Sequence, residues 1–159
     1  MSPAAEGHRI GPATPTLRIL AALALAAFGL ACQDARPAVT VYKTPTCGCC
    51  SKWVEHMRAA GFEVSTVDLQ SLDRVKAEQG VPVALSACHT AIVDGYVVEG
   101  HVPAADVERL LETRPAVRGL AVAGMPIGSP GMEGPRPERY TVHAFDAQGR
   151  TKAFATHGP

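Results

Sequence analysis

The sequence predicts a single domain of the α/β class, in which short strands alternate with amphipathic helices. A length of 159 residues suits one domain with a sizeable core, and 47% hydrophobic against 19% charged residues argues against disorder. After residue 38, apolar segments with strand and helix patterns follow one another. Asp94-Gly95, between two β-branched runs, is a strong hairpin signal. These observations together favour a mixed sheet flanked by helices.

The charge balance excludes one broad class of function. The 15 Lys and Arg residues match the 15 Asp and Glu residues, so the formal net charge is zero. Proteins that neutralise nucleic-acid phosphates normally have a basic excess, and aromatic residues that could stack on bases make up only 5% of this chain. We therefore expect no nucleic-acid partner. Nothing in the sequence demands more than a monomer.

The first 31 residues are typical of an export signal. Two arginines, Arg9 and Arg18, precede twelve uncharged residues from Ile19 to Leu30, fewer than the roughly 20 that a membrane-spanning helix needs. Small residues then lead to Cys32, so the segment 1–31 predicts either plain cleavage or a lipoprotein signal that ends in acylation of Cys32. A retained N-terminal helix is the less favoured alternative. We expect a periplasmic protein, soluble or lipid-anchored at Cys32, in surroundings where disulfides persist.

Strand and helix patterns alternate along the next part of the chain. The strand patterns are rich in β-branched residues, and the helix patterns are bounded by glycine or proline. In chain order, the predicted elements are a strand at Val39–Tyr42, a helix at Ser51–Ala60, a strand at Phe62–Leu69, a helix at Ser71–Gln79, hairpin strands at Thr90–Val93 and Tyr96–Val98, and a helix from Pro103 to about Arg114. The order βαβα-ββα, with an antiparallel hairpin after parallel strands, describes a thioredoxin-like fold over residues 38–115.

The last part of the chain, residues 116–159, is expected to be an extension that packs on this core. Between Gly119 and Gly134, glycine and proline are too frequent for a regular element. A terminal hairpin is predicted from Tyr140–Phe145 and Thr151–Ala155, which flank a polar turn. The prediction is thus one domain with a Gly/Pro/Met-rich addition.

Reactive side chains concentrate where the first predicted strand meets the first predicted helix. Cys47 and Cys50 have the C-x-x-C spacing of redox motifs, and we expect them to be the catalytic pair if the protein has thiol chemistry. A helix start favours thiolates, which are both nucleophiles and soft metal ligands. Cys49 would compete as a disulfide partner, but adjacent thiolates could bridge metal ions. A structural disulfide with one inert thiol remains an open alternative.

A second cluster, Cys88-His89, comes just before the strand that opens the predicted hairpin. In a thioredoxin-like topology this segment faces the C-x-x-C motif. Cys88 could therefore complete a four-thiol metal site with Cys47, Cys49 and Cys50, and His89 is a ligand candidate of second rank. The alternative for Cys88 is a small buried hydrophobic residue.

Met125 and Met132 are further ligand candidates, because they lie in the Gly/Pro-rich stretch and outside any periodic pattern. Thioether sulfur is a soft ligand that selects Cu(I), although methionine also fills irregular gaps in cores. We expect both side chains to lie close to the start of the helix that carries Cys47 and Cys50.

Two other histidines are not expected to be ligands. On a helix, 100° per residue turns His56 away from Cys50, so the two would not bind one metal. His101, before Pro103, is expected to cap the third helix and to be solvated.

The motifs together resemble the CopG-type envelope copper-resistance family, which is distinct from the ribbon-helix-helix repressor of the same name. The resemblance covers about residues 38–156 and rests on the segments TPTCGCCSKWVEHM, SACHT and GMPIGSPGME, which begin at Thr44, Ser86 and Gly124. It implies a thioredoxin-like domain whose C-terminal extension contributes to metal binding. It also implies copper bound by the C-x-C-C cysteines and a role in interconverting Cu(I) and Cu(II) during detoxification.

The sequence therefore leads to the hypothesis of an envelope copper-binding protein, with one or more copper ions and redox-active cysteines. Copper-efflux components are the partners such a role would need. Two alternatives stay open: a thiol–disulfide oxidoreductase in which Cys47 and Cys50 act without metal, and a copper carrier or buffer without catalysis. Zinc suits the motif less, because three cysteines in four positions do not comfortably surround one tetrahedral ion.

Overall fold

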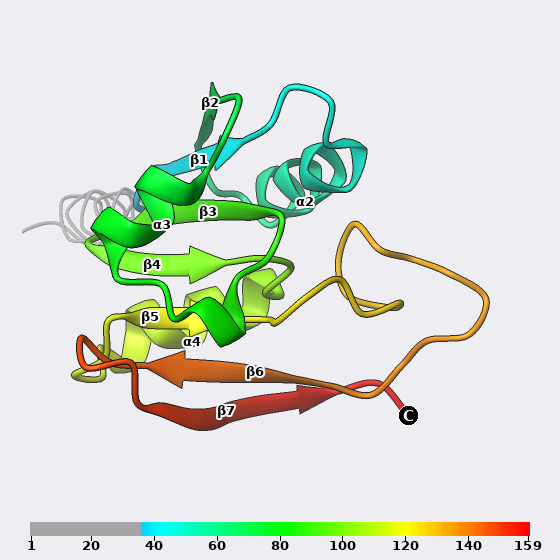
Figure 1. Ribbon diagram of the computed structural model, residues 1–159. Coiled ribbons are helices and arrows are strands. Elements are labelled where there is room, and N and C mark those ends of the chain that lie inside the picture. The colour runs from blue at the N-terminus through cyan, green and yellow to red at the C-terminus, as the bar shows by residue number, and fades with distance from the viewer. Residues whose placement is uncertain (1–35) are drawn as a thin grey trace, which may run out of the picture. The chain divides into compact units, whose positions relative to one another are not determined.

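A seven-stranded mixed sheet runs through residues 36–159, the part of the chain that the computed structural model describes (Figure 1). The strands are β1 Val39–Lys43, β2 Val64–Asp68, β3 His89–Val93, β4 Tyr96–Glu99, β5 Gly119–Ala121, β6 Tyr140–Phe145 and β7 Thr151–His157. The helices are α2 Gly48–Ala59, α3 Asp73–Gln79 and α4 Ala104–Thr113, with a 3-10 turn, η2, at Val83–Leu85. The predicted export signal and Cys32 lie outside the described residues.

The sheet has the strand order β2-β1-β3-β4-β5-β6-β7. Parallel pairs occur at β1–β2 and β4–β5, and the other neighbouring strands are antiparallel. The predicted α/β class is confirmed. The three last strands continue the sheet of the first four, so the C-terminal part of the chain is joined to the rest by backbone hydrogen bonds.

The local predictions agree well with the observed elements as far as α4. Helix α2 begins at Gly48 and not at Ser51, so that Cys49 and Cys50 lie within its first turn. At the predicted hairpin, Asp94 (φ 46°) and Gly95 (φ 83°) both adopt the left-handed conformation that a tight two-residue turn requires.

One prediction of irregular structure is wrong, because β5 lies within the stretch expected to hold no regular element. Gly119 pairs with Val97 of β4, and a Cβ at Gly119 would lie 1.9 Å from the Val97 carbonyl oxygen. Glycine here permits a close approach of two backbones, so it promotes the strand pairing that its propensity argues against.

Helices and turns cover both faces of the sheet. On one face, Trp53 and Met57 of α2 and Leu110 of α4 pack with buried strand residues such as Val41. On the other face, a smaller cluster contains Leu85, Val97, Ala121 and Phe145. Figure 1 shows α3 on the near side of the sheet and α4 behind it. Within residues 36–159, no helix is both long and apolar enough to cross a bilayer.

Candidate metal centre

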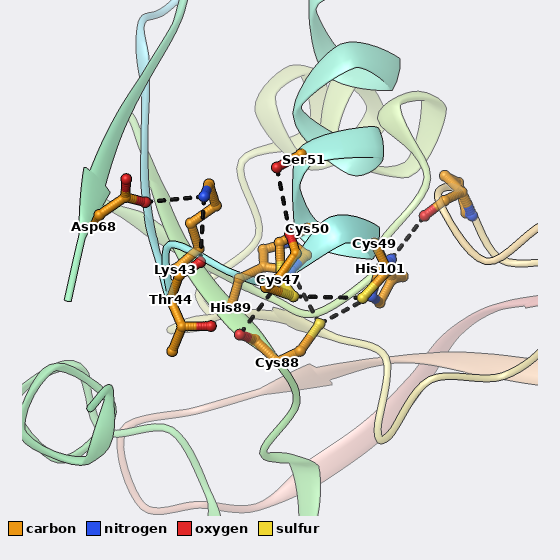
Figure 2. The surroundings of a disulfide bond; sticks show 11 residues. Lys43, Thr44, Cys47, Cys49, Cys50, Ser51, Asp68, Cys88, His89 and His101 are labelled. Carbon is orange, nitrogen blue, oxygen red and sulfur yellow. Dashed lines mark hydrogen bonds and ion pairs between the residues drawn. A yellow bond between two sulfur atoms is a disulfide. The ribbon is translucent and has the colours of Figure 1, made fainter. Parts of the chain in front are cut away.

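The Cys-Gly-Cys-Cys motif forms the start of α2, directly after β1 and a short turn. Cys47 precedes the first helical residue, and its carbonyl accepts the hydrogen bond of the Ser51 backbone N–H at 3.2 Å. Cys49 and Cys50 therefore lie in the first turn of the helix, where the backbone N–H groups have no partner within the helix. The local sequence thus places three sulfurs together at the start of one helix (Figure 2).

Cys47 and Cys50 form a disulfide, with Cα atoms 5.3 Å apart. Cys50 is fully buried, whereas Cys49 is partly exposed and has a free thiol. The Cys49 sulfur lies 3.5 Å from the Cys47 sulfur. The disulfide is compatible with redox chemistry and equally with the structural alternative left open by the sequence. Binding of a soft metal by all these sulfurs requires that the disulfide be reduced.

Cys88 faces the motif from the segment before β3. Its carbonyl oxygen lies 3.6 Å from the Cys50 sulfur. Its own sulfur belongs to a group of four, with Cys47, Cys49 and Cys50, in which all sulfur atoms lie within 4.8 Å of one another. The structure thus brings the four predicted thiol ligands together, which is the arrangement a thiolate-bridged metal site needs.

His101 also contacts this group, contrary to the sequence-based expectation. It is fully buried, its Nε2 lies 2.9 Å from the Cys88 sulfur, and its Nδ1 donates a hydrogen bond to the Pro130 carbonyl at 2.7 Å. Because the carbonyl can only accept, Nδ1 carries the proton and the Nε2 lone pair faces Cys88. The prediction of a solvated, helix-capping His101 is wrong. The cap of α4 is His56, whose Nε2 accepts the Ala104 N–H at 3.0 Å.

A signal for His101 was present in the predicted hairpin. In the observed register Thr90 pairs with Glu99, so the residues just outside the two strands must also lie close together. Extending this register by two places sets Cys88 opposite His101. The proximity of Cys88 and His101 thus follows from the Asp94-Gly95 turn. Their spacing in the sequence, by contrast, does not indicate that they are neighbours.

His89 lies beside this pair and is fully buried. Its ring packs on Trp53 with centroids 4.5 Å apart, and its Nδ1 lies 3.4 Å from the Cys88 sulfur. Its Nε2 is buried without a hydrogen-bond partner among the described residues. An unpaired buried polar atom is costly, so a ligand would relieve this cost. Cys88, His89 and His101 form a second group with metal-binding geometry, their ligand atoms within 4.8 Å.

Burial keeps the Cys88 thiol and the imidazoles of His89 and His101 uncharged. It raises the pKa of the Cys88 thiol to about 12, and the neighbouring Cys49 adds to the shift. Burial also lowers the pKa of His89 and that of His101, so both imidazoles are neutral near pH 7. A neutral imidazole can bind a metal without losing a proton, whereas the Cys88 thiol must release its proton when a metal binds. The donor set, four sulfurs and two imidazoles, fits a soft ion such as Cu(I).

The C-terminal extension covers one side of the centre. Gly131 lies against the first turn of α2, where an added Cβ would be 2.7 Å from the Cys49 carbonyl oxygen. Met132 and Cys49 both line an adjoining cavity of about 550 Å³. Met125 instead has 52% of its surface exposed. Of the two predicted methionine ligands, Met132 is therefore placed beside the cysteine motif and Met125 faces solvent.

Comparisons with known proteins identify the family of this chain. A family model described as "Protein of unknown function, DUF411" matches residues 85–132, which include Cys88, His89, His101 and both methionines. No curated protein matches the chain. Two solved structures, "Copper resistance protein copG", Form 2 and Form 1, are each 42% identical to it with a TM-score of 0.74. Their alignments cover 77% and 78% of this chain and 99% of each solved chain. The chain therefore belongs to the CopG-type copper-resistance family.

Proposed function

We propose that this protein binds copper in the cell envelope and changes the oxidation state of the metal by using its own cysteines. The observation that carries the proposal is the gathering of four cysteine sulfurs within 4.8 Å of one another, with the Nε2 of His101 at 2.9 Å from one of them. Sulfur and imidazole donors suit copper, and the solved relatives are named copper resistance proteins.

The proposed ligands are Cys47, Cys49, Cys50 and Cys88, completed by imidazole from His101 and His89. Met132 is a further weak ligand that would shield the site and still allow copper to leave. The site could hold more than one copper ion, because it has several donors and a thiolate can bridge two metals. Copper is the substrate in this proposal, and the protein contributes ligands and electrons.

The Cys47–Cys50 pair supplies the electrons for the reduction of copper. Oxidation of the two thiols to one disulfide releases two electrons and two protons, and the electrons reduce two Cu(II) ions to two Cu(I) ions. Reduction of the disulfide by an external thiol or dithiol restores the pair. Since disulfide sulfurs are poor ligands, the oxidised form observed here has lost two of its copper ligands. Redox state and metal affinity are thereby coupled.

The proposal includes the fold type and the location. A thioredoxin-like core over residues 38–115 is supported by the order β2-β1-β3-β4, with β3 antiparallel to its neighbours, and by the cysteine motif at the start of α2. The extension over residues 116–159 adds β5 to β7 and the segment that contains Gly131. Export to the periplasm rests on the predicted signal 1–31, and the protein would be soluble there or lipid-anchored at Cys32. It would act as a monomer that passes copper to efflux components.

One observation favours a second candidate function, a thiol–disulfide oxidoreductase without metal. The Cys47–Cys50 disulfide at the start of a helix is itself a complete redox unit. In that case Cys88 and His101 would be packing residues near the disulfide. A copper carrier that transfers the metal with its oxidation state unchanged is the third candidate.

The test is the copper content and absorption spectrum of the reduced, full-length protein with Cu(I) added. We expect bound copper in the native protein and a sharp loss in Cys47→Ser, Cys50→Ser and Cys88→Ser, with circular dichroism unchanged. Glu55→Ala, an exposed position on the next turn of the same helix, is the matched control and should bind copper normally. Full copper content in all three cysteine variants would contradict the proposal. Disulfide reductase turnover by metal-free protein would favour the second candidate.

A further inference from the structure

Glu99 is a fully buried acidic residue at the end of β4, and the copper proposal does not use it. Its cross-strand partner is Thr90 of β3. Because side chains alternate along a strand, Thr90 and Glu99 point to the sheet face that carries α3, whereas His89 points to the Trp53 side. A buried carboxylate on the face opposite a candidate metal centre requires an explanation.

Glu99 accepts hydrogen bonds from the residues on either side of the Cys88-His89 dipeptide. One carboxylate oxygen accepts the Ala87 backbone N–H at 2.7 Å, and the other accepts the Thr90 hydroxyl at 2.7 Å. Ala87 directly precedes Cys88, and Thr90 directly follows His89. One carboxylate therefore holds both ends of the Cys88-His89 dipeptide.

Lys76 of α3 completes this arrangement. Its ammonium group donates to the first Glu99 oxygen and, at 3.1 Å, to the Thr90 hydroxyl. The ammonium compensates the buried carboxylate, which would otherwise be strongly unfavourable. An ion pair alone would need only Lys76 and Glu99. The additional contact to the Ala87 N–H links this pair to the segment that carries a proposed ligand.

We propose that Glu99 is a positioning residue for the metal centre, which acts through Ala87 and Thr90 to fix the backbone that presents Cys88 and His89. The inference rests on the proposed copper function and assigns a role to a residue that touches neither metal nor cysteine sulfur. Groups that orient metal ligands from outside typically change metal affinity by about 10–100-fold when they are removed.

The test compares two variants of the full-length protein in which residue 99 either can or cannot accept a hydrogen bond. Lys76→Met combined with Glu99→Gln keeps an oxygen for the Ala87 N–H, and Lys76→Met combined with Glu99→Leu removes it. Both lack the ion pair and carry the same charge. We expect Cu(I) affinity, measured by competition with a Cu(I) chelator, to be about 10–100-fold weaker in the Leu variant than in the Gln variant. Equal affinities would overturn the proposal.

A second comparison separates positioning from a general loss of stability. In the Cys88→Ser background, the affinity difference between the Gln and Leu variants should become smaller, because one of the two ligands that Glu99 positions is gone. A difference of unchanged size would show that Glu99 does not act through Cys88. If the Leu variant does not fold, Thr90→Val replaces it, since this variant loses only the hydroxyl, and we expect a several-fold weaker affinity. An affinity equal to that of the native protein would then overturn the proposal.

Amide exchange at Ala87 in the reduced, metal-free protein provides a readout that is independent of copper. Exchange should be faster in the Leu variant than in the Gln variant, at equal global stability. If the native protein binds no copper, the proposed function fails, while this measurement still decides whether Glu99 holds the segment. Equal exchange rates would show that it does not.

Discussion

Gly131→Ala should both destabilise the protein and disturb the metal centre, because Gly131 lies in contact with the backbone of α2. Its φ of +86° is in the left-handed region, which costs a residue with a Cβ about 1–2 kcal/mol. The new Cβ would also lie 2.7 Å from the Cys49 carbonyl oxygen and 3.0 Å from the Trp53 nitrogen. Both atoms belong to helix backbone, which yields little. Overpacking of this kind typically costs about 1–3 kcal/mol more.

Gly124→Ala is the matched control in the same extension. Gly124 has a φ of +68° but nothing within 4 Å of an added Cβ, so only the conformational cost of about 1–2 kcal/mol applies. The free energy of unfolding should therefore fall by about 2–5 kcal/mol for Gly131→Ala and by about 1–2 kcal/mol for the control. Urea unfolding measures both, by circular dichroism and by the fluorescence of Trp53, the single and fully buried tryptophan.

The same substitution has a consequence for the site. Displacement of the segment around Gly131 moves the Pro130 carbonyl away from His101 Nδ1, which removes the hydrogen bond that orients the ring. We expect weaker Cu(I) binding in Gly131→Ala and unchanged binding in Gly124→Ala. Equal stability losses within about 0.5 kcal/mol, together with equal copper affinity, would refute the packing argument.

Two further predictions concern the sulfur atoms. Burial raises the pKa of Cys88 to about 12, so the rate of its alkylation by iodoacetamide in metal-free protein should rise about tenfold per pH unit up to pH 10. For a thiol with the ordinary pKa of about 8.5, the rate would level off above that pH. Peptide-resolved mass spectrometry measures this rate, and a plateau below pH 9 would contradict it. Met132→Leu should lower Cu(I) affinity several-fold at near-native stability, while the same change at the exposed Met125 should leave affinity unchanged. Equal chelator-competition curves for the two variants would argue that Met132 only fills space.

The alternation of strands and helices was predictable because it depends on local chemistry. β-branched runs, the glycines after two helices, and the Asp94-Gly95 turn each act over a few neighbouring residues, and the observed elements follow them closely. The three clustered cysteines were equally visible, since they lie within four positions of one another, although the helix that contains Cys49 and Cys50 begins at Gly48 and not at the predicted Ser51. For such features the sequence by itself was sufficient.

Contacts across the sheet were decided only by the tertiary structure. His101 reaches Cys88 through the hairpin register, and Glu99 reaches Ala87 from the opposite face of the sheet. Likewise, Met132 lies beside Cys49, whereas Met125 is exposed. The sequence could not predict this difference, because a Gly/Pro-rich segment has no periodic pattern that indicates its path. Such contacts join residues that are not neighbours in the chain. Apart from the hairpin register that relates His101 to Cys88, local propensities contain no information about them. The sequence therefore determined which residues could bind a soft metal, and the packing of sheet, helix and extension decided which of them meet.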